Sequence, residues 1–286
     1  MKTLLYATDY SKSSVSALQS AYSLSRDLGT RLVIAHVFGY PKVLGMEGLD
    51  IRPVLEINPF KQHRSELEKF CNECLGSTWE IPNVLLEPVQ NGSVTKGIIS
   101  KAEEYRAQLI LVGTQGRSGL EEVILGSTTK KLIEKAPCPV AAIPMDMQPR
   151  KIQTIVYATD FEEEDIHAIQ KLLEITQLLK AKIKVVHIST KEEYAGDLLM
   201  EWFKEMLLSK VDCPDLAFEL LFSEDVFDTL QSYLGEVNAD VVAMLERERK
   251  GFSKKWFHKD LVKRIEEFGQ VILISFNEHN HQTLYF

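Results

Sequence analysis

The feature that most constrains the fold of this chain is an internal repeat. The run Leu5–Asp9 (LYATD) returns 151 residues later as Val156–Asp160 (VYATD), and Ile34–Val37 falls on Val185–Ile188 with the same offset. Self-similarity at a long, fixed distance indicates two copies of one unit rather than a single large domain. A length of 286 residues also favours about two domains. We therefore expect a chain of two tandem domains.

The two copies differ in length. Later in the copies the offset falls to 132, because Leu109–Val112 matches Val241–Met244 and Val140–Ile143 matches Ile272–Ser275. The first copy therefore carries 19 extra residues, the difference between offsets of 151 and 132. The segment Gly39–Pro59, rich in Gly and Pro and without a clear period, is the candidate for this insertion. The predicted domains are residues 1–146 and 147–286, joined by the short segment 145–151, so we expect the copies to touch.

Short apolar runs alternate with amphipathic stretches in each copy. In the first copy the pattern predicts strands near 3–7, 31–37, 83–88, 108–112 and 139–143, and helices near 12–28, 60–75, 94–105 and 120–135. This alternation is typical of βαβ units, in which helices cover both faces of a parallel sheet. Ser11 or Ser13 is expected to cap the first helix. Ligands of such sheets bind at the carboxyl ends of the strands, where Thr8, Asp9 and Gly113 fall.

Composition excludes several classes of protein. The net charge is −8, and all of the excess acid lies in residues 147–286, which disfavours general nucleic-acid binding. No apolar stretch is long enough to span a membrane and no signal peptide is evident, so we expect a cytoplasmic protein without membrane contact. Cys71 and Cys74 form a C-x-x-C pair inside a helical pattern, which favours reduced thiols over redox or metal chemistry. His36 and His187 lie at the ends of buried strands and are expected to be core histidines rather than ligands.

A glycine pattern follows the predicted fourth strand. Gly113 and Gly116 are followed, after nine residues, by Gly126, Ser127 and Thr128. Glycine lets the backbone approach an anion, while hydroxyl groups and the start of the next helix add donors, so the pattern suits a di- or triphosphate. The alternative is that these glycines only turn the chain and pack the helix. We favour the phosphate interpretation because three glycines and the hydroxyl residues stand together in one spaced pattern directly after the predicted fourth strand.

These motifs resemble the universal stress protein family. The resemblance rests on the glycine pattern, on the strand end Ala7-Thr8-Asp9, on His36-Val37 and on Ala136–Val140 before the last strand, and it covers nearly the whole chain as two copies. It implies a doubly wound α/β fold in each copy, with a five-stranded parallel sheet of order 3-2-1-4-5. It also implies ATP as the ligand, with or without Mg²⁺. In that family domains commonly pair through their last strands, so Val140–Ile143 and Val271–Ile274 would meet as an intrachain pseudo-dimer, and a further homodimer stays open.

The resemblance also assigns the site residues. Asp9 would contact the ribose or adenine, with Ala7 and Thr8 beside it, and Val37 would pack near the adenine. The phosphates would lie against Gly113, Gly116, Gly126, Ser127 and Thr128. Arg117 either helps to neutralise phosphate or is an exposed loop arginine.

The second copy breaks the phosphate pattern. At an offset of 132 the glycines fall on Leu245, Glu248 and His258, and the hydroxyl pair falls on Lys259-Asp260. Side chains would block the backbone approach, and Glu248 would repel phosphate. Arg247–Arg264 carries eight basic side chains, which form either a substitute anion site or, as we favour, a solvated helix face.

Three functions fit these observations. The leading hypothesis is an ATP-binding stress-response regulator with one nucleotide site, in the first copy. No catalytic constellation is apparent, so slow ATP hydrolysis or phosphoryl transfer, with Ser127 or Thr128 as acceptor, is the enzymatic alternative. The third is a structural dimerisation module without a ligand.

Overall fold

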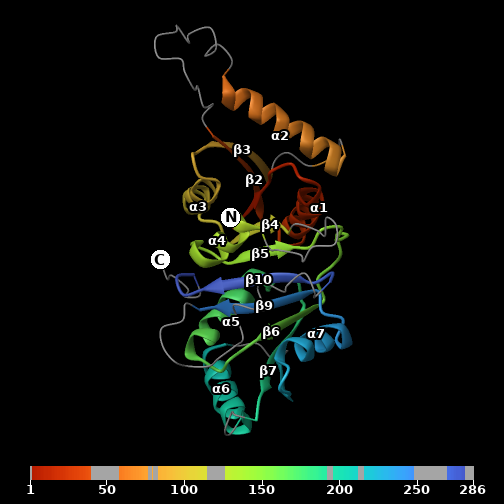
Figure 1. The fold of residues 1–286 in the computed structure, drawn as a ribbon, viewed down its shortest axis with the longest axis vertical. Coiled ribbons are helices and arrows are strands. Elements are labelled where there is room, and N and C mark those ends of the chain that lie inside the picture. Colours follow the sequence, from red (N-terminus) through yellow and green to blue (C-terminus); the bar gives the residue numbers. More distant parts are fainter. Residues whose placement is uncertain are drawn as a thin grey trace.

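The fold is taken from a computed structural model of the chain (Figure 1). It describes residues 2–39, 58–76, 79, 83–114, 126–191, 196–211, 216–247 and 269–280. The N-terminal half contains β1 (Thr3–Ala7), α1 (Lys12–Asp27), β2 (Arg31–Phe38), α2 (Pro59–Leu75), β3 (Val84–Gln90), α3 (Val94–Glu104), β4 (Leu109–Gly113), α4 (Ser127–Lys135) and β5 (Val140–Ile143). The C-terminal half contains β6 (Thr154–Ala158), α5 (Glu163–Thr176), β7 (Lys182–Ser189), α6 (Gly196–Lys210), β8 (Leu216–Phe222), α7 (Val226–Glu236), β9 (Val241–Glu246) and β10 (Ile272–Asn277).

All ten strands form one sheet, in the order β3-β2-β1-β4-β5-β10-β9-β6-β7-β8. Within each half every strand pairing is parallel and the order is 3-2-1-4-5, which confirms the predicted doubly wound fold. The halves join through β5 and β10, which pair antiparallel with Ala141 opposite Ile274. The predicted meeting of the last strands is therefore confirmed, and Figure 1 shows the two halves stacked about this junction.

The sheet register corrects one detail of the repeat. Leu4 pairs with Leu109 and Ile155 pairs with Val241, in agreement with offsets of 151 and 132. However, Ile110 pairs with Val140 whereas Val242 pairs with Leu273, so the last strands are related by an offset of 133 rather than 132. A shift of one residue exchanges the two faces of a strand, and apolar runs on both faces hide it from sequence comparison.

The extra chain of the first copy lies between β2 and β3. The connection from β2 to α2 takes residues 39–58, whereas the equivalent connection from β7 to α6 takes only residues 190–195. The rest of the 19-residue difference comes from α2, which is slightly longer than α6, and from the connection between α2 and β3, which is slightly longer than that between α6 and β8. The predicted insertion at Gly39–Pro59 lies almost entirely outside the described residues.

Helices cover both faces of the sheet, so each face has its own core. On one face α1, α2, α5 and α6 pack through side chains such as Leu18, Leu67, Ile169 and Phe203. On the other face α3, α4 and α7 pack through Ile98, Leu132 and Leu230. Among the helices that the structure describes, none is long and apolar enough to cross a membrane.

The two cysteines of the C-x-x-C pair lie in α2, as predicted. Cys71 is buried and Cys74 half-buried, and neither forms a disulfide. Burial raises the pKa of Cys71 to about 12, which keeps this thiol protonated and unreactive. Within the described parts of the chain, no three His, Cys, Asp or Glu side chains gather in a way that could hold a metal ion.

Candidate functional site

Asp9 lies in the turn that leaves β1, at the carboxyl end of the sheet. One of its oxygens, Oδ1, accepts hydrogen bonds from the Ser11 amide (3.0 Å) and from the Ser14 hydroxyl (2.8 Å). Partial burial opposes ionisation, but the bonds from Ser11 and Ser14 outweigh it and hold the pKa of Asp9 below its usual value. Asp9 is therefore a charged, exposed acceptor, held in place through one oxygen.

The expected capping of α1 takes a different form. Ser11 is the N-cap residue, but within the described residues its side chain makes no capping bond to the helix. Its hydroxyl lies 2.9 Å from that of Ser13 instead. The Ser14 amide, which a serine cap would bind, donates to the Ser11 carbonyl oxygen at 3.0 Å. The prediction of a serine cap was therefore wrong in its chemistry, although correct in its position.

His36 supports this turn from β2. Its Nδ1 lies 2.9 Å from the carbonyl oxygen of Thr8, and its ring stacks on Tyr10 at 4.2 Å between centroids. Tyr10 has a left-handed backbone, with φ of 63°, which is unusual for a residue other than glycine. His36 is thus a structural histidine, as predicted, and it fixes the backbone beside Asp9.

Ala7 and Val37 lie on the same face of the sheet as α3 and α4, and both are half-buried. Gly97 of α3 makes room for Val37, because a Cβ at Gly97 would lie 2.8 Å from Val37 Cγ1. The neighbouring Thr8 is buried, and its hydroxyl accepts a hydrogen bond from the Tyr10 amide at 3.0 Å. Ala7, Asp9 and Val37 therefore all lie at the carboxyl ends of β1 and β2, which are neighbours in the sheet.

Gly113 ends β4 on the opposite side of that region, and its surroundings explain why it is glycine. A Cβ there would lie 2.6 Å from the carbonyl oxygen of Ser13 and 3.4 Å from Ala17 Cβ. The close neighbour is thus the backbone of α1. Gly113 is required for the packing of α1 against β4, whatever else it contacts.

The other glycine position has no such packing partner. Gly126 is the N-cap of α4, and a Cβ there would meet, among the described atoms, only Thr129 Oγ1 at 3.9 Å. Its φ of −53° is open to any residue. Ser127 and Thr128 follow in the first turn of α4, whose amides lack acceptors within the helix. Gly116 and Arg117 lie outside the described residues.

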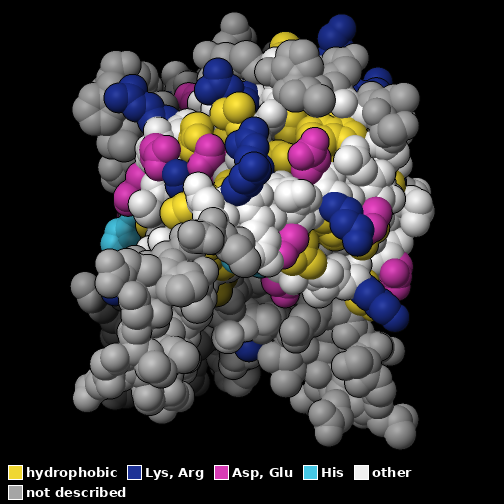
Figure 2. All heavy atoms as spheres, turned by 90° about the horizontal axis from the view of Figure 1, so that it is seen from above, with side chains coloured by type: hydrophobic (Ala, Val, Ile, Leu, Met, Phe, Trp, Pro, Cys, Tyr) yellow, Lys and Arg dark blue, Asp and Glu magenta, His cyan; other side chains and the backbone are white. Residues whose placement is uncertain are grey.

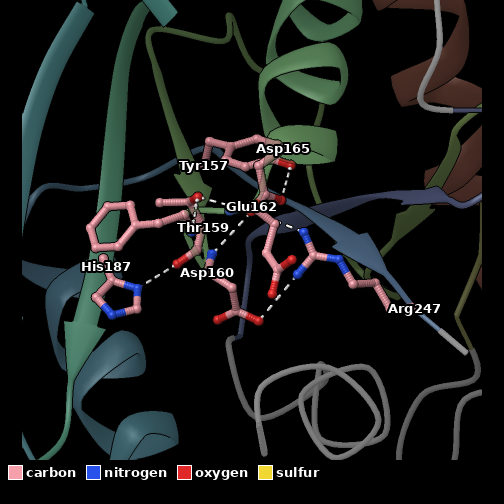
Figure 3. Close-up of polar contacts among 8 residues, drawn as sticks. Tyr157, Thr159, Asp160, Glu162, Asp165, His187 and Arg247 are labelled. Carbon is pink, nitrogen blue, oxygen red and sulfur yellow. Dashed lines mark hydrogen bonds and ion pairs between the residues drawn. The ribbon is translucent and has the colours of Figure 1, made fainter. Parts of the chain in front are cut away.

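The equivalent region of the C-terminal half is built differently (Figure 3). Asp165 takes the place of Ser14 and is fully buried. It accepts hydrogen bonds from the Tyr157 hydroxyl (2.9 Å), the Thr159 hydroxyl (3.0 Å) and the Asp160 amide (3.1 Å). Asp160, which corresponds to Asp9, is only 6% exposed. Two carboxylates thus lie close together below the surface.

Arg247 bridges this pair of acids. Its Nη1 lies 3.3 Å from Asp160 Oδ2, and its Nη2 lies 3.1 Å from Asp165 Oδ2. Burial acts to lower the pKa of the guanidinium, but Asp165 and Asp160 raise it above its ordinary value, so Arg247 stays charged. The interpretation of Arg247 as part of a solvated helix face was wrong: it follows β9 directly and bridges two acids, as Figure 3 shows.

The strand-end regions of the two halves also differ in burial. Ala158 and Ile188 correspond to Ala7 and Val37, and they are 2% and 1% exposed. Leu245, the counterpart of Gly113, is fully buried in the core. The other predicted departures from the glycine pattern, at Glu248, His258 and Lys259-Asp260, fall outside the described residues.

The sequence shows that acids, Asp165 among them, replace the serines at the start of this helix, but sequence reasoning missed the link between Asp165 and Arg247. The repeat alignment already contains the signal, because an offset of 151 places an acid on Ser14 and an offset of 132 places Arg247 on Gln115. A new acid and a new base at aligned positions of one site indicate an ion pair.

Fold and site together define a tandem doubly wound α/β protein whose two strand-end sites have diverged. The family model of the universal stress protein family matches residues 1–144. Universal stress protein YxiE of Bacillus subtilis is 31% identical over 144 residues, covering 49% of this chain and 97% of the relative. Universal stress protein MJ0531 of Methanocaldococcus jannaschii is 25% identical over 144 residues, covering 50% of this chain and 81% of the relative.

Solved structures match the whole tandem arrangement. A universal stress protein from Archaeoglobus fulgidus has a TM-score of 0.67 and 15% identity, over 96% of this chain and 98% of that chain. A functionally unknown protein from Pseudomonas aeruginosa PAO1 has a TM-score of 0.59 and 15% identity, over 98% of this chain and 93% of that chain. This chain belongs to the universal stress protein family.

Proposed function

We propose that this protein is an ATP-binding stress-response regulator with a single nucleotide site, in its N-terminal half. The nucleotide would lie at the carboxyl ends of β1, β2 and β4, between the Asp9 turn and the start of α4. The C-terminal half would bind no nucleotide and would serve as the partner of the binding half. The observation that carries the proposal is the contrast between the exposed Asp9 and the buried, ion-paired Asp160.

The adenosine end of the site has fitting chemistry. Asp9 is held through Oδ1, which leaves Oδ2 to accept hydrogen bonds from ribose hydroxyls or a base amine. Ala7 and Val37 are half-buried apolar side chains that could cover one side of a purine. Ligand sites of this kind are mostly apolar, with a few fixed polar groups.

The phosphate end of the site rests on the start of α4. Among the described residues, no side chain caps this helix, so its first amides and the hydroxyls of Ser127 and Thr128 are suitable donors for phosphate oxygens. Lys130 and Lys131 lie one turn further along α4 and add positive charge. Any Mg²⁺ would accompany the triphosphate and bridge its oxygens.

The proposal is tested by the nucleotide content of the freshly purified chain, followed by calorimetric titration with ATP. We expect one adenine nucleotide per chain in native mass spectrometry and a stoichiometry of one in the titration. A chain that is purified empty and shows no heat and no thermal shift with millimolar ATP would refute nucleotide binding and leave the structural module as the function.

A matched pair of variants locates the site. Asp9→Asn keeps an acceptor oxygen for Ser11 and Ser14 but removes the charge, and we expect at least about tenfold weaker ATP binding. Asp160→Asn makes the same change at the equivalent position of the C-terminal half and should leave the affinity unchanged. Equal losses in both variants would contradict a single N-terminal site. Release of phosphate from ATP in a single-turnover experiment would favour the alternative function, a slow ATPase.

A further inference from the structure

The sheet of this protein ends in two edge strands with very different surroundings. Beside β3, at the N-terminal edge, α2 exposes mostly polar and charged side chains, and Figure 2, viewed from this end, shows charges of both signs among hydrophobic patches. Pro88 removes one amide from β3, and Glu87 is paired with Lys101 at 3.2 Å. Proline is a usual protection of an edge strand against pairing with another chain.

The C-terminal edge, β8, lacks this protection. Its sequence, Leu216–Phe222 (LAFELLF), contains no proline, and its one charge, Glu219, is paired with Lys184 at 2.6 Å, just as the equivalent Glu87 of β3 is paired with Lys101. Among the strands that the structure describes, β8 pairs with β7 alone. The outer backbone groups of β8 are therefore available as a template for another strand.

An apolar surface flanks this edge on the α6 side of the sheet. Of the eight large hydrophobic side chains that are exposed in the described chain, five lie on α6 or at the end of β8: Leu198, Leu199, Trp202, Leu208 and Phe222. Leu198 is 74% exposed and Phe222 69%. Phe218 and Leu220 pack toward the α6 face, and by strand alternation Phe222 lies on that face too. Gly196, at the start of α6, lies close to Leu220, so the two groups adjoin.

We propose that this edge is the interface of a homodimer, in which β8 pairs antiparallel with β8 of a second copy and α6 packs against its counterpart. The chain already contains the same arrangement. At the β5–β10 junction two edge strands pair antiparallel, and the paired residues Ala141 and Ile274 belong to the same core face, so that face continues across the junction. A two-fold axis at β8 would keep both α6 helices on one face in the same way.

Charge favours a second copy over an unrelated partner. The exposed acids Asp197 and Glu201 lie in the first half of α6, whereas its last residue is Lys210, whose Nζ lies 3.5 Å from the exposed Glu163 in a surface pair that solvent screens. In an antiparallel pair the acidic half of one α6 faces the basic end of the other. The surface is thus complementary to itself in charge as well as in its apolar character. This dimer does not depend on nucleotide binding.

The test is sedimentation velocity of the full chain over a concentration series, without added nucleotide. We expect a reversible dimer at micromolar concentrations and at least about thirtyfold weaker association for Trp202→Glu and for Leu198→Glu, because buried apolar anchors dominate interfaces. Val94→Glu is the matched control, since Val94 is exposed to a similar extent in the N-terminal half and should leave the dimer unchanged. Circular dichroism melting verifies that each variant is folded.

Hydrogen exchange tests the strand pairing itself. The β8 amides should exchange at least about tenfold more slowly in the dimer than in the Trp202→Glu monomer. A chain that stays monomeric at about 100 µM, a dimer that survives both α6 variants, or β8 amides that exchange equally in monomer and dimer would each overturn the proposal.

Discussion

The turns that follow β1 and β6 have nearly the same backbone and opposite chemistry. Tyr10 and Phe161 both adopt a left-handed conformation, with φ of 63° and 61°. His36 and His187 each place Nδ1 within 2.9 Å of the threonine carbonyl that precedes the aspartate. The scaffold that positions an aspartate at the strand end has therefore been kept in both halves.

What differs is the group that satisfies each aspartate. In the N-terminal half, neutral donors from Ser11 and Ser14 hold Asp9 and leave its charge to be matched from outside the turn. In the C-terminal half, Asp165 replaces the serine and Arg247 supplies the countercharge from within the chain. A site that carries its own counterion has no need of a ligand. The two copies have thus diverged in the source of the positive charge beside the aspartate, which in the C-terminal half is Arg247 of the chain itself.

The largest expected effect comes from removing that internal counterion. Arg247→Met should lower the free energy of unfolding by about 3 kcal/mol, because loss of one partner leaves buried charge uncompensated. Chemical denaturation at neutral pH measures the change. In an Asp160→Asn/Asp165→Asn background the same substitution should cost much less. If both backgrounds lose the same amount, the ion pairs do not account for the role of Arg247.

A second prediction separates the packing role of one glycine from the ligand role of another. Gly113→Ala should destabilise the fold by about 2 kcal/mol, because the added methyl group overlaps the Ser13 carbonyl. Gly126→Ala meets no close atom among the described residues and should cost about 1 kcal/mol or less, the difference between Gly and Ala at an N-cap. It should nevertheless weaken ATP binding, since the proposed phosphate position adjoins this start of α4. Thermal melting should show the larger loss of stability in Gly113→Ala, and calorimetry should show weaker ATP binding in Gly126→Ala. An unchanged ATP affinity in Gly126→Ala would count against the proposed phosphate position.

The third prediction concerns the link between the halves. Asn277, the last residue of β10, donates from Nδ2 to the carbonyl oxygens of Ile133 (2.9 Å) and Ala136 (3.1 Å) at the end of α4. Asn277→Asp keeps the oxygen that accepts from the His279 amide but loses both donors. We expect a loss of about 1–2 kcal/mol and faster amide exchange at the end of α4. A variant that matches the wild type in both stability and exchange would show that the Asn277 side chain does not anchor α4, and would leave that role to Asn280, whose Nδ2 also donates to the Ala136 carbonyl oxygen at 3.1 Å.

Much of this architecture could be predicted from the sequence, because the repeat and the alternation of apolar runs indicate two parallel α/β units, and the resemblance to the universal stress protein family implies the strand order within each half. Predicted and observed strands agree closely, as for β1 at residues 3–7. The contacts at the sites were harder to foresee. Gly113 signals close approach to something, but only the fold reveals that its neighbour is the Ser13 carbonyl rather than a ligand. Arg247 and Asp165 are 82 residues apart in the sequence, so their pairing depends on the sheet order that brings β9 beside β6.

The smallest expected effect is a pH dependence that distinguishes the N-terminal turn. Burial is the largest influence on His36 and lowers its pKa, although the bond to the Thr8 carbonyl acts in the opposite direction. The unfolded chain therefore binds a proton at this histidine more readily than the folded chain does, so stability contributed by neutral His36 is present above about pH 6.5 and is lost as the pH falls below it. His36→Gln, which retains an amide donor for Thr8, should flatten the decline in unfolding free energy between about pH 7 and pH 5. An unaltered slope would mean that other groups cause the acid sensitivity, and the turn at Asp9 would then keep its shape in acid without help from a neutral imidazole.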